Sequence, residues 1–141
     1  MEHDSKVHYQ TFPANAKQRF RLSMNAEARL FSVTDFEQPS DGILIRSVVL
    51  ETKDAVIVVR YVLPGQEIPA HIHPHGQDTW TVLSGRAEYF KGHGEAGIIK
   101  AKDIAVARPK QVHGAKNLGD EPFVFVSVVT PASAGYNLAE K

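Results

Sequence analysis

The chain contains no cysteine among its 141 residues. Disulfides and thiolate metal ligands are therefore excluded, and any bound metal ion must be held by nitrogen and oxygen atoms. The chain also has no excess of charge of either sign, because sixteen Lys and Arg residues balance sixteen Asp and Glu residues. Without a positive excess or a basic stripe, we expect no nucleic-acid partner.

Long apolar runs are missing as well. No segment reaches the roughly 18 consecutive apolar residues that a membrane-spanning helix needs, so we expect no membrane partner. The first ten residues are polar and mixed in charge, unlike a secretory signal. These absences together predict a cytoplasmic protein.

What the chain does contain is a series of short apolar segments separated by Gly, Pro, Asp or Asn. They recur about every 8 to 12 residues and are rich in Val, Ile, Phe and Thr, which is typical of an antiparallel sandwich or barrel. The segments are 28–33, 42–51, 55–63, 78–83, 87–90, 97–101, 103–107, 111–117 and 122–130. We expect one all-β domain over 26–141. Residues 1–25 would precede it as an arm with one short strand, or as a disordered tail.

Three of the seven histidines lie within five residues. If His71 and His73 lie on a strand, both point to the same face and start about 6.5–7 Å apart. Two imidazoles at that spacing can reach one metal ion through bonds of about 2.0–2.1 Å. Pro74 is expected to end the strand, which would leave His75 in the turn. Solvated or hydrogen-bonded histidines are the alternative interpretation.

A longer pattern surrounds this pair. Gly65, His71, His73, Asp78 and Gly85 are spaced as in the first sequence motif of the cupin family, which this stretch resembles. The family usually has glutamate at the position of Asp78.

A second, more divergent stretch resembles the other cupin motif. Lys102 and Asp103 stand where the family has Gly-Asp, and Lys110 replaces a second glycine. His113 lies at the family distance from Lys102, and Asn117 completes the motif.

This resemblance implies a double-stranded β-helix, or jelly-roll barrel, that binds one divalent metal ion. The ion would be iron, nickel, manganese, zinc or copper, since nitrogen and oxygen ligands do not select among these. The ligands implied by the motifs are His71, His73, Asp78 and His113. Aspartate is one methylene shorter than glutamate, so His75 or Gln77 could take the place of Asp78.

The strand alternation also predicts the wall of a substrate pocket. Trp80 shares a face with Asp78, and Gln111 shares one with His113. Trp80 would be a stacking surface or part of the core, and Arg60 would bind a substrate carboxylate or face solvent. The predicted pocket residues are Trp80, Arg60, Gln111 and Phe125.

The resemblance implies a metal-dependent enzyme that acts on a small polar or aromatic molecule inside the barrel. A dioxygenase-like oxidoreductase is favoured, with an isomerase or lyase as the nearest alternatives. A non-catalytic cupin that binds or senses a small molecule or a metal is the other hypothesis. We also expect a homodimer, because pairing would cover exposed sheet edges.

Overall fold

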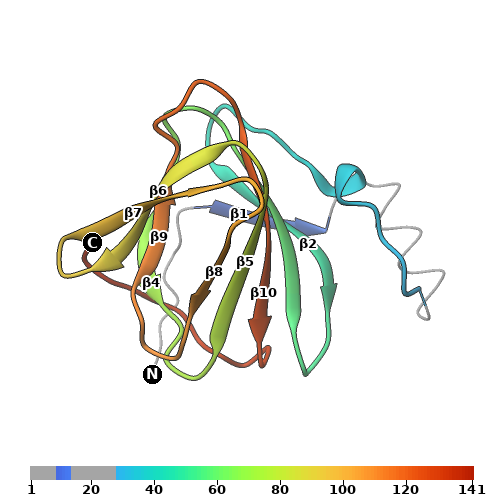
Figure 1. Ribbon diagram of the computed structural model, residues 1–141. Coiled ribbons are helices and arrows are strands. Elements are labelled where there is room, and N and C mark those ends of the chain that lie inside the picture. Colours follow the sequence, from blue (N-terminus) through green and yellow to red (C-terminus); the bar gives the residue numbers. More distant parts are fainter. Residues whose placement is uncertain (1–8, 14–27) are drawn as a thin grey trace.

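The computed structural model describes residues 9–13 and 28–141. They form two β-sheets that face each other across a shared core (Figure 1). The first sheet has the strand order β1-β2-β3-β10-β5-β8, and the second has the order β11-β4-β9-β6-β7. From β3 onward the chain alternates between the sheets, and only β6 and β7 follow each other within one sheet. This arrangement is the predicted double-stranded β-helix.

Each predicted apolar segment from residue 42 onward coincides with one strand, whereas three further strands, β1, β4 and β11, lie outside those segments. The first sheet comprises β1 (Tyr9–Pro13), β2 (Leu44–Glu51), β3 (Val56–Val62), β10 (Phe123–Thr130), β5 (Gln77–Ser84) and β8 (Ile104–Ala107). The second comprises β11 (Asn137–Leu138), β4 (Glu67–Ile72), β9 (His113–Lys116), β6 (Arg86–Gly92) and β7 (Glu95–Lys100). The short strand expected in the N-terminal arm corresponds to β1, which pairs in parallel with β2. Residues 1–8 and 14–25 of the predicted arm lie outside the described residues.

Alternation along β10 shows how the two faces of the first sheet differ. Phe123 and Phe125 are fully buried and belong to the cluster between the sheets. Val126 points the other way and packs with Val59 and Phe36 on the outer face. The inner cluster consists of Leu44, Val62, Ile68, Trp80, Val82, Ala87, Ile99, Ala115, Phe123 and Phe125.

The prediction of a strand at 28–33 is wrong. This segment has no strand pairing and leads into a 3-10 helix, η1 (Val33–Phe36). Its apolar residues serve a different purpose, because Phe31, Val33 and Phe36 pack on the outer face of the first sheet. An apolar run that covers a sheet and one that forms a strand have the same composition, so the pattern alone did not separate them. In the described part of the chain, no helix is long and apolar enough to cross a membrane.

Two lysines adopt a backbone conformation that favours glycine. Lys102 has φ 80° and Lys110 has φ 72°. Both lysines stand at positions where the second cupin motif has glycine. Each lysine therefore adopts a left-handed conformation that is strained for a residue with a side chain.

Candidate metal centre

Four buried side chains meet between the sheets and could together hold a metal ion. His71, His73, Asp78 and His113 each offer one ligand atom, and these atoms lie within 4.8 Å of one another. The four residues are 4, 8, 3 and 1% exposed, respectively. The histidines come from the second sheet and its adjoining turn, whereas Asp78 comes from the first sheet. The cluster therefore exists only when the two sheets are packed together.

Pairing of β4 with β9 brings two of the three histidines together. His71 lies directly opposite His113 in the register, and their ring centroids are 4.1 Å apart. The backbones approach closely here, because a Cβ on Gly114 would lie 2.7 Å from the carbonyl oxygen of Ile68. A glycine immediately after His113 is thus required for this strand pairing.

His73 follows β4 and is held by a segment from the end of the chain. Its Nδ1 lies 2.7 Å from the carbonyl oxygen of Gly135. The adjacent Tyr136 stacks on the ring of His71, with centroids 4.8 Å apart and planes inclined by 24°. The segment that leads into β11 therefore forms one wall of the cluster.

Hydrogen bonds to the backbone fix the same tautomer in all three histidines. The Nδ1 atoms of His71 and His113 lie 2.7 Å and 3.2 Å from the carbonyl oxygens of Pro69 and Gln111. A carbonyl oxygen only accepts, so each Nδ1, including that of His73, carries the hydrogen and donates it. In a neutral ring Nε2 then presents a lone pair toward the cluster. Histidines that bind metals through one ring nitrogen usually donate the N–H of the other nitrogen in this way, which fixes the orientation of the ring.

Asp78 is positioned by two further donors. The hydroxyl of Ser127 donates to its Oδ1 at 2.6 Å, and the indole N–H of Trp80 donates to its Oδ2 at 3.1 Å. Oδ2 also lies 2.9 Å from Nε2 of His113 and 3.3 Å from Nε2 of His73. The shorter aspartate side chain thus reaches the histidines directly.

These contacts provide a test of whether a metal fits. With Nδ1 protonated, the neutral rings of His73 and His113 turn Nε2 lone pairs toward Oδ2 of Asp78, which is itself an acceptor. Acceptors that face one another in a buried site need a cation between them, either a proton or a metal ion. The donor set of three imidazoles and one carboxylate suits a first-row transition metal. The residues present therefore fit one divalent ion.

The protonation states agree with that interpretation. Burial lowers the pKa of His71 well below its usual value, and the nearby charges of His113 and His73 lower it further. Burial alone would raise the pKa of Asp78, but protons on Nε2 of His113 and His73 outweigh it through hydrogen bonds and charge and hold that pKa far below the usual range. A metal ion at the same place would supply positive charge to the carboxylate instead of those protons. A neutral imidazole and an ionised carboxylate are the forms that bind metals.

The two alternative ligands lie apart from the cluster. His75 is exposed in the turn after β4, as its position after Pro74 predicted. Gln77 is partly buried, and its amide donates to the hydroxyl of Thr79. Neither belongs to the group of four.

The predicted pocket residues have different locations. Gln111 is exposed, and its side-chain oxygen accepts the backbone N–H of Arg108, so its predicted place in the pocket wall is wrong. The alternation breaks in the turn before β9. Trp80 and Phe125 are buried and stacked with centroids 4.0 Å apart, and they form core next to the cluster. Arg60 is only 6% exposed and lies inside the barrel, on the same sheet face as Phe125.

Sequence reasoning missed Ser127 and Tyr136. A polar residue that follows Phe123 and Phe125 on the inner face of one strand was the available signal for Ser127. Tyr136 stands in a stretch without alternation, and nothing near it in the sequence connects it with His71.

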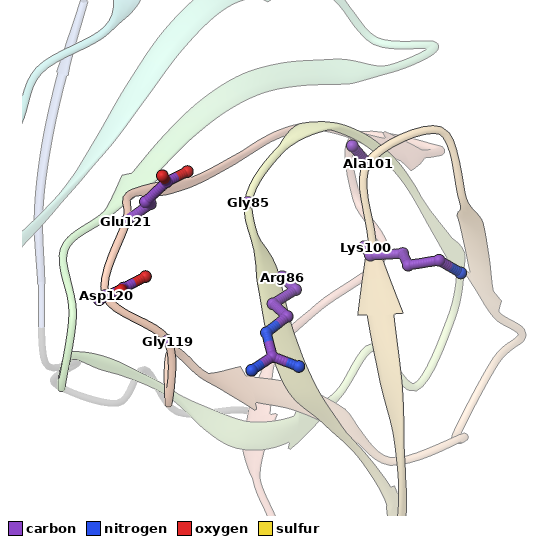
Figure 2. Close-up of a pocket in the computed structure, with 7 residues that line it drawn as sticks. All are labelled: Gly85, Arg86, Lys100, Ala101, Gly119, Asp120 and Glu121. Atoms are coloured by element: carbon purple, nitrogen blue, oxygen red, sulfur yellow. The ribbon is translucent and has the colours of Figure 1, made fainter.

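A separate hollow lies on the surface, away from these four residues. Its volume is about 250 Å³, and Figure 2 shows Arg86 and Lys100 on neighbouring strands with Asp120 and Glu121 on the loop across from them. Gly85, Ala101 and Gly119 complete the lining. No residue predicted from the sequence as part of the site contributes to it.

Comparison with known proteins identifies the class. The family model described as a cupin domain matches residues 58–129, which include all four clustered side chains. The chain belongs to the cupin family.

Among solved structures, the chain is similar to an uncharacterized conserved protein with a double-stranded β-helix domain from Klebsiella pneumoniae. The identity is 63%, the match covers 82% of this chain and 100% of that one, and the TM-score is 0.79. More distant likenesses show the fold alone. A predicted oxalate decarboxylase from Thermotoga maritima is 22% identical over 56% of this chain and 68% of that one, with a TM-score of 0.53. KdgF from Halomonas sp. is 24% identical over 61% of this chain and 76% of that one, with a TM-score of 0.56. Among curated proteins, no relative matches this chain.

Proposed function

We propose that this cupin binds one divalent transition-metal ion and uses it to catalyse a reaction of a small molecule inside the barrel. A dioxygenase-like oxidoreductase is the favoured class, with isomerase and lyase chemistry next. The observation that carries the proposal is the buried cluster of three imidazoles and one carboxylate between the sheets. The ligand atoms are those of His71, His73, Asp78 and His113.

The charge of the site supports catalysis rather than a purely structural role. Three neutral imidazoles and one carboxylate compensate only one of the two charges of a divalent ion. Four protein ligands also leave positions for a substrate at six-coordination. When bound, such an ion can polarise an oxygen ligand or bring dioxygen and a chelating substrate together.

The chain's own residues orient the metal ligands and exclude water from the site. Backbone carbonyls orient the three rings, and Ser127 and Trp80 hold the carboxylate of Asp78. The near-complete burial of the cluster excludes bulk water, which strengthens electrostatic interactions with a bound substrate.

Metal analysis tests the first half of the proposal. The untagged protein, purified without chelators, should contain about one equivalent of a divalent transition metal by mass spectrometry. The variant with His71→Ala and His73→Ala should lose it, whereas the exposed control His75→Ala should retain it. A wild-type protein that takes up none of iron, nickel, manganese, zinc or copper would contradict the proposal.

Turnover tests the second half. The iron-loaded protein should consume dioxygen in the presence of at least one member of a panel of chelating 2-oxo acids and catechols, with both oxygen atoms recovered in the organic product. A loaded protein that binds panel members without converting them would favour the non-catalytic binding cupin instead. The homodimer and the cytoplasmic location stay predictions.

A further inference from the structure

The surface hollow of Figure 2 lies far from the metal cluster along the same strand. Asp78 is near the start of β5, whereas Gly85, which lines the hollow, directly follows the last residue of β5. Roughly 23 Å of strand therefore separates the two places. Binding in the hollow would be independent of the metal ion and of the proposed function.

Hydrogen bonds fix both walls of the hollow. One wall is the loop before β10, which Asn117 holds from inside the barrel. The fully buried side chain of Asn117 donates to the carbonyl oxygen of Glu121 at 2.8 Å and accepts the backbone N–H of Gly119 at 2.9 Å. On the facing wall, Ala101 after β7 donates its backbone N–H to the carbonyl oxygen of Gly85 at 3.1 Å. The volume of about 250 Å³ is thus preformed, so a ligand would not have to order it.

Two residues of the cupin motifs build the hollow and not the metal cluster. Gly85 closes the first motif and Asn117 completes the second, but neither belongs to the group of four ligands. A Cβ on Gly85 would collide with the carbonyl oxygen of Pro122, so the start of β6 and the loop approach each other closely. This approach places Arg86 against the loop, where a Cβ on Gly119 would lie 3.9 Å from Nε of Arg86.

Charges of both signs line the hollow from opposite walls. Arg86 extends from β6, and Asp120 and Glu121 extend from the loop across from it (Figure 2). Within the described part of the chain, these three side chains form no ion pair with one another. The ammonium group of Lys100 lies 3.7 Å from the carboxylate of Asp103 and points away from the loop. The guanidinium group of Arg86 therefore provides the positive charge of the hollow.

This distribution of charge selects against ligands with charge of one sign. A simple anion would be attracted by Arg86 but repelled by the two carboxylates, and a simple amine would meet the opposite combination. A molecule with both charges matches both walls. A guanidinium group binds a carboxylate through two parallel hydrogen bonds, and an ammonium group has three donors for carboxylate oxygens.

We propose that the hollow binds a small zwitterion that carries both an ammonium group and a carboxylate, such as a free amino acid. The carboxylate of the ligand binds Arg86, and its ammonium group binds Asp120 and Glu121. All three side chains are exposed, so each ion pair contributes modestly to the affinity.

Matched small molecules test this proposal. Isotope-labelled protein would be titrated in NMR experiments with L-alanine, β-alanine and 4-aminobutyrate, whose charges are separated by increasing distances. Propionate and ethylamine, or butyrate and propylamine for 4-aminobutyrate, carry only one of the two charges. At least one zwitterion should shift the backbone amides of Gly85, Ala101 and Gly119. It should also bind about fivefold more tightly than both of its singly charged analogues, the gain expected for one exposed ion pair.

Two results of these titrations would overturn the proposal. One is that no zwitterion binds more tightly than its singly charged analogues. The other is that the shifts are confined to the surroundings of the metal cluster, which the backbone amide of Gly114 reports. Metal uptake by the same protein has no bearing on either result, so the proposed function and the zwitterion site can fail separately.

Charge variants connect the binding to the two walls. Arg86→Glu should weaken binding of the zwitterion about fivefold. Adding Glu121→Arg returns the same charges on exchanged walls, so the double variant should recover the affinity with the ligand reversed. A purely structural role of Arg86 would not produce this recovery. The exposed control Arg108→Glu should bind as the wild type does.

Unchanged affinity in Arg86→Glu, or a folded double variant without recovery, would contradict the assignment. If Arg86→Glu does not fold, Glu121→Gln tests the wall that binds the ammonium group. This exposed substitution should also weaken binding, and equal affinity in Glu121→Gln would count against the proposal.

Discussion

The hydroxyl of Ser127 donates a 2.6 Å hydrogen bond to Oδ1 of Asp78, across 49 residues of sequence. The bond leaves Oδ2 directed at His73 and His113. A side chain outside the ligand set thus determines how the carboxylate is presented to a metal.

Replacing this serine should weaken metal binding without unfolding the barrel. Ser127→Ala frees Asp78 to rotate, and loss of such a partner typically costs about 10- to 100-fold in metal affinity. Competition with a chromophoric chelator would measure the change. The exposed control Ser133→Ala should bind as wild type does, and equal affinity in Ser127→Ala would show that the hydrogen bond has no positioning role.

Removing the charge of Asp78 should have a larger effect. Asp78→Asn keeps the shape of the side chain but leaves the metal with neutral ligands only, so we expect an affinity loss of more than about 100-fold, or about 3 kcal/mol. Asp103→Asn, at a half-exposed carboxylate in the β7–β8 turn, is the matched control. Comparable affinities in the two variants would argue for a site made by the three histidines alone.

The metal-free protein should lose stability as the pH falls from 7 to 5. The pKa of His71 is lowered by burial, so the unfolded chain binds more protons than the folded one below about pH 6.5. The slope contributed by one such group is at most about 1.4 kcal/mol per pH unit. Asp78, whose pKa is also lowered, contributes in the same direction only below about pH 5, so the window from 7 to 5 separates the contribution of His71 from that of Asp78.

Urea unfolding at several pH values would measure this slope. His71→Asn should reduce the slope, and His75→Ala should leave it unchanged. A stability that is independent of pH in this window would contradict a neutral, buried His71.

Restoring the missing motif glycines should stabilise the protein. Lys102 and Lys110 have positive φ, a conformation that costs an L-residue about 1–2 kcal/mol. Glycine removes this strain, but it loses more chain entropy on folding, which offsets part of the gain. Lys102→Gly and Lys110→Gly should therefore each add about 0.5–1 kcal/mol to the free energy of unfolding. Lys91→Gly, on the exposed side of β6, should destabilise instead. The reverse order of effects would refute the strain argument.

A methyl group at Gly76 should disturb the metal centre from outside it. The added Cβ would collide with the Cβ of Ala134 and the carbonyl oxygen of Thr130. The displaced segment includes Gly135, whose carbonyl orients His73, so metal affinity should fall together with a loss of about 1–3 kcal/mol in stability. Gly42→Ala, where no atom lies within 4 Å, is the control in both measurements.

The fold could be predicted because its signals are local. Alternating apolar strands and turn residues recur along the chain, and the motif spacing places His71, His73, Asp78 and His113 in register. The orienting partners could not be predicted in the same way. They are backbone carbonyls, which every residue possesses, or side chains such as Ser127 that meet their partner only through tertiary packing.

Errors arose where local composition fits more than one structure. The apolar run at 28–33 covers a sheet instead of joining one. Gln111 follows the parity of His113 only if the strand extends to it, but β9 begins at His113 itself. Periodicity extrapolated across a turn loses its meaning, because each strand fixes its own phase.

The contact between Gly135 and His73 spans 62 residues and has a consequence for folding kinetics. Hairpins such as β6–β7 can form early from neighbouring residues, whereas the orientation of His73 requires the two ends of a long loop to meet. Metal capture should therefore belong to the last stage of refolding. In a stopped-flow experiment, the signal of a bound cobalt ion would lag behind the burial of Trp80, and its rate would report when the barrel closes.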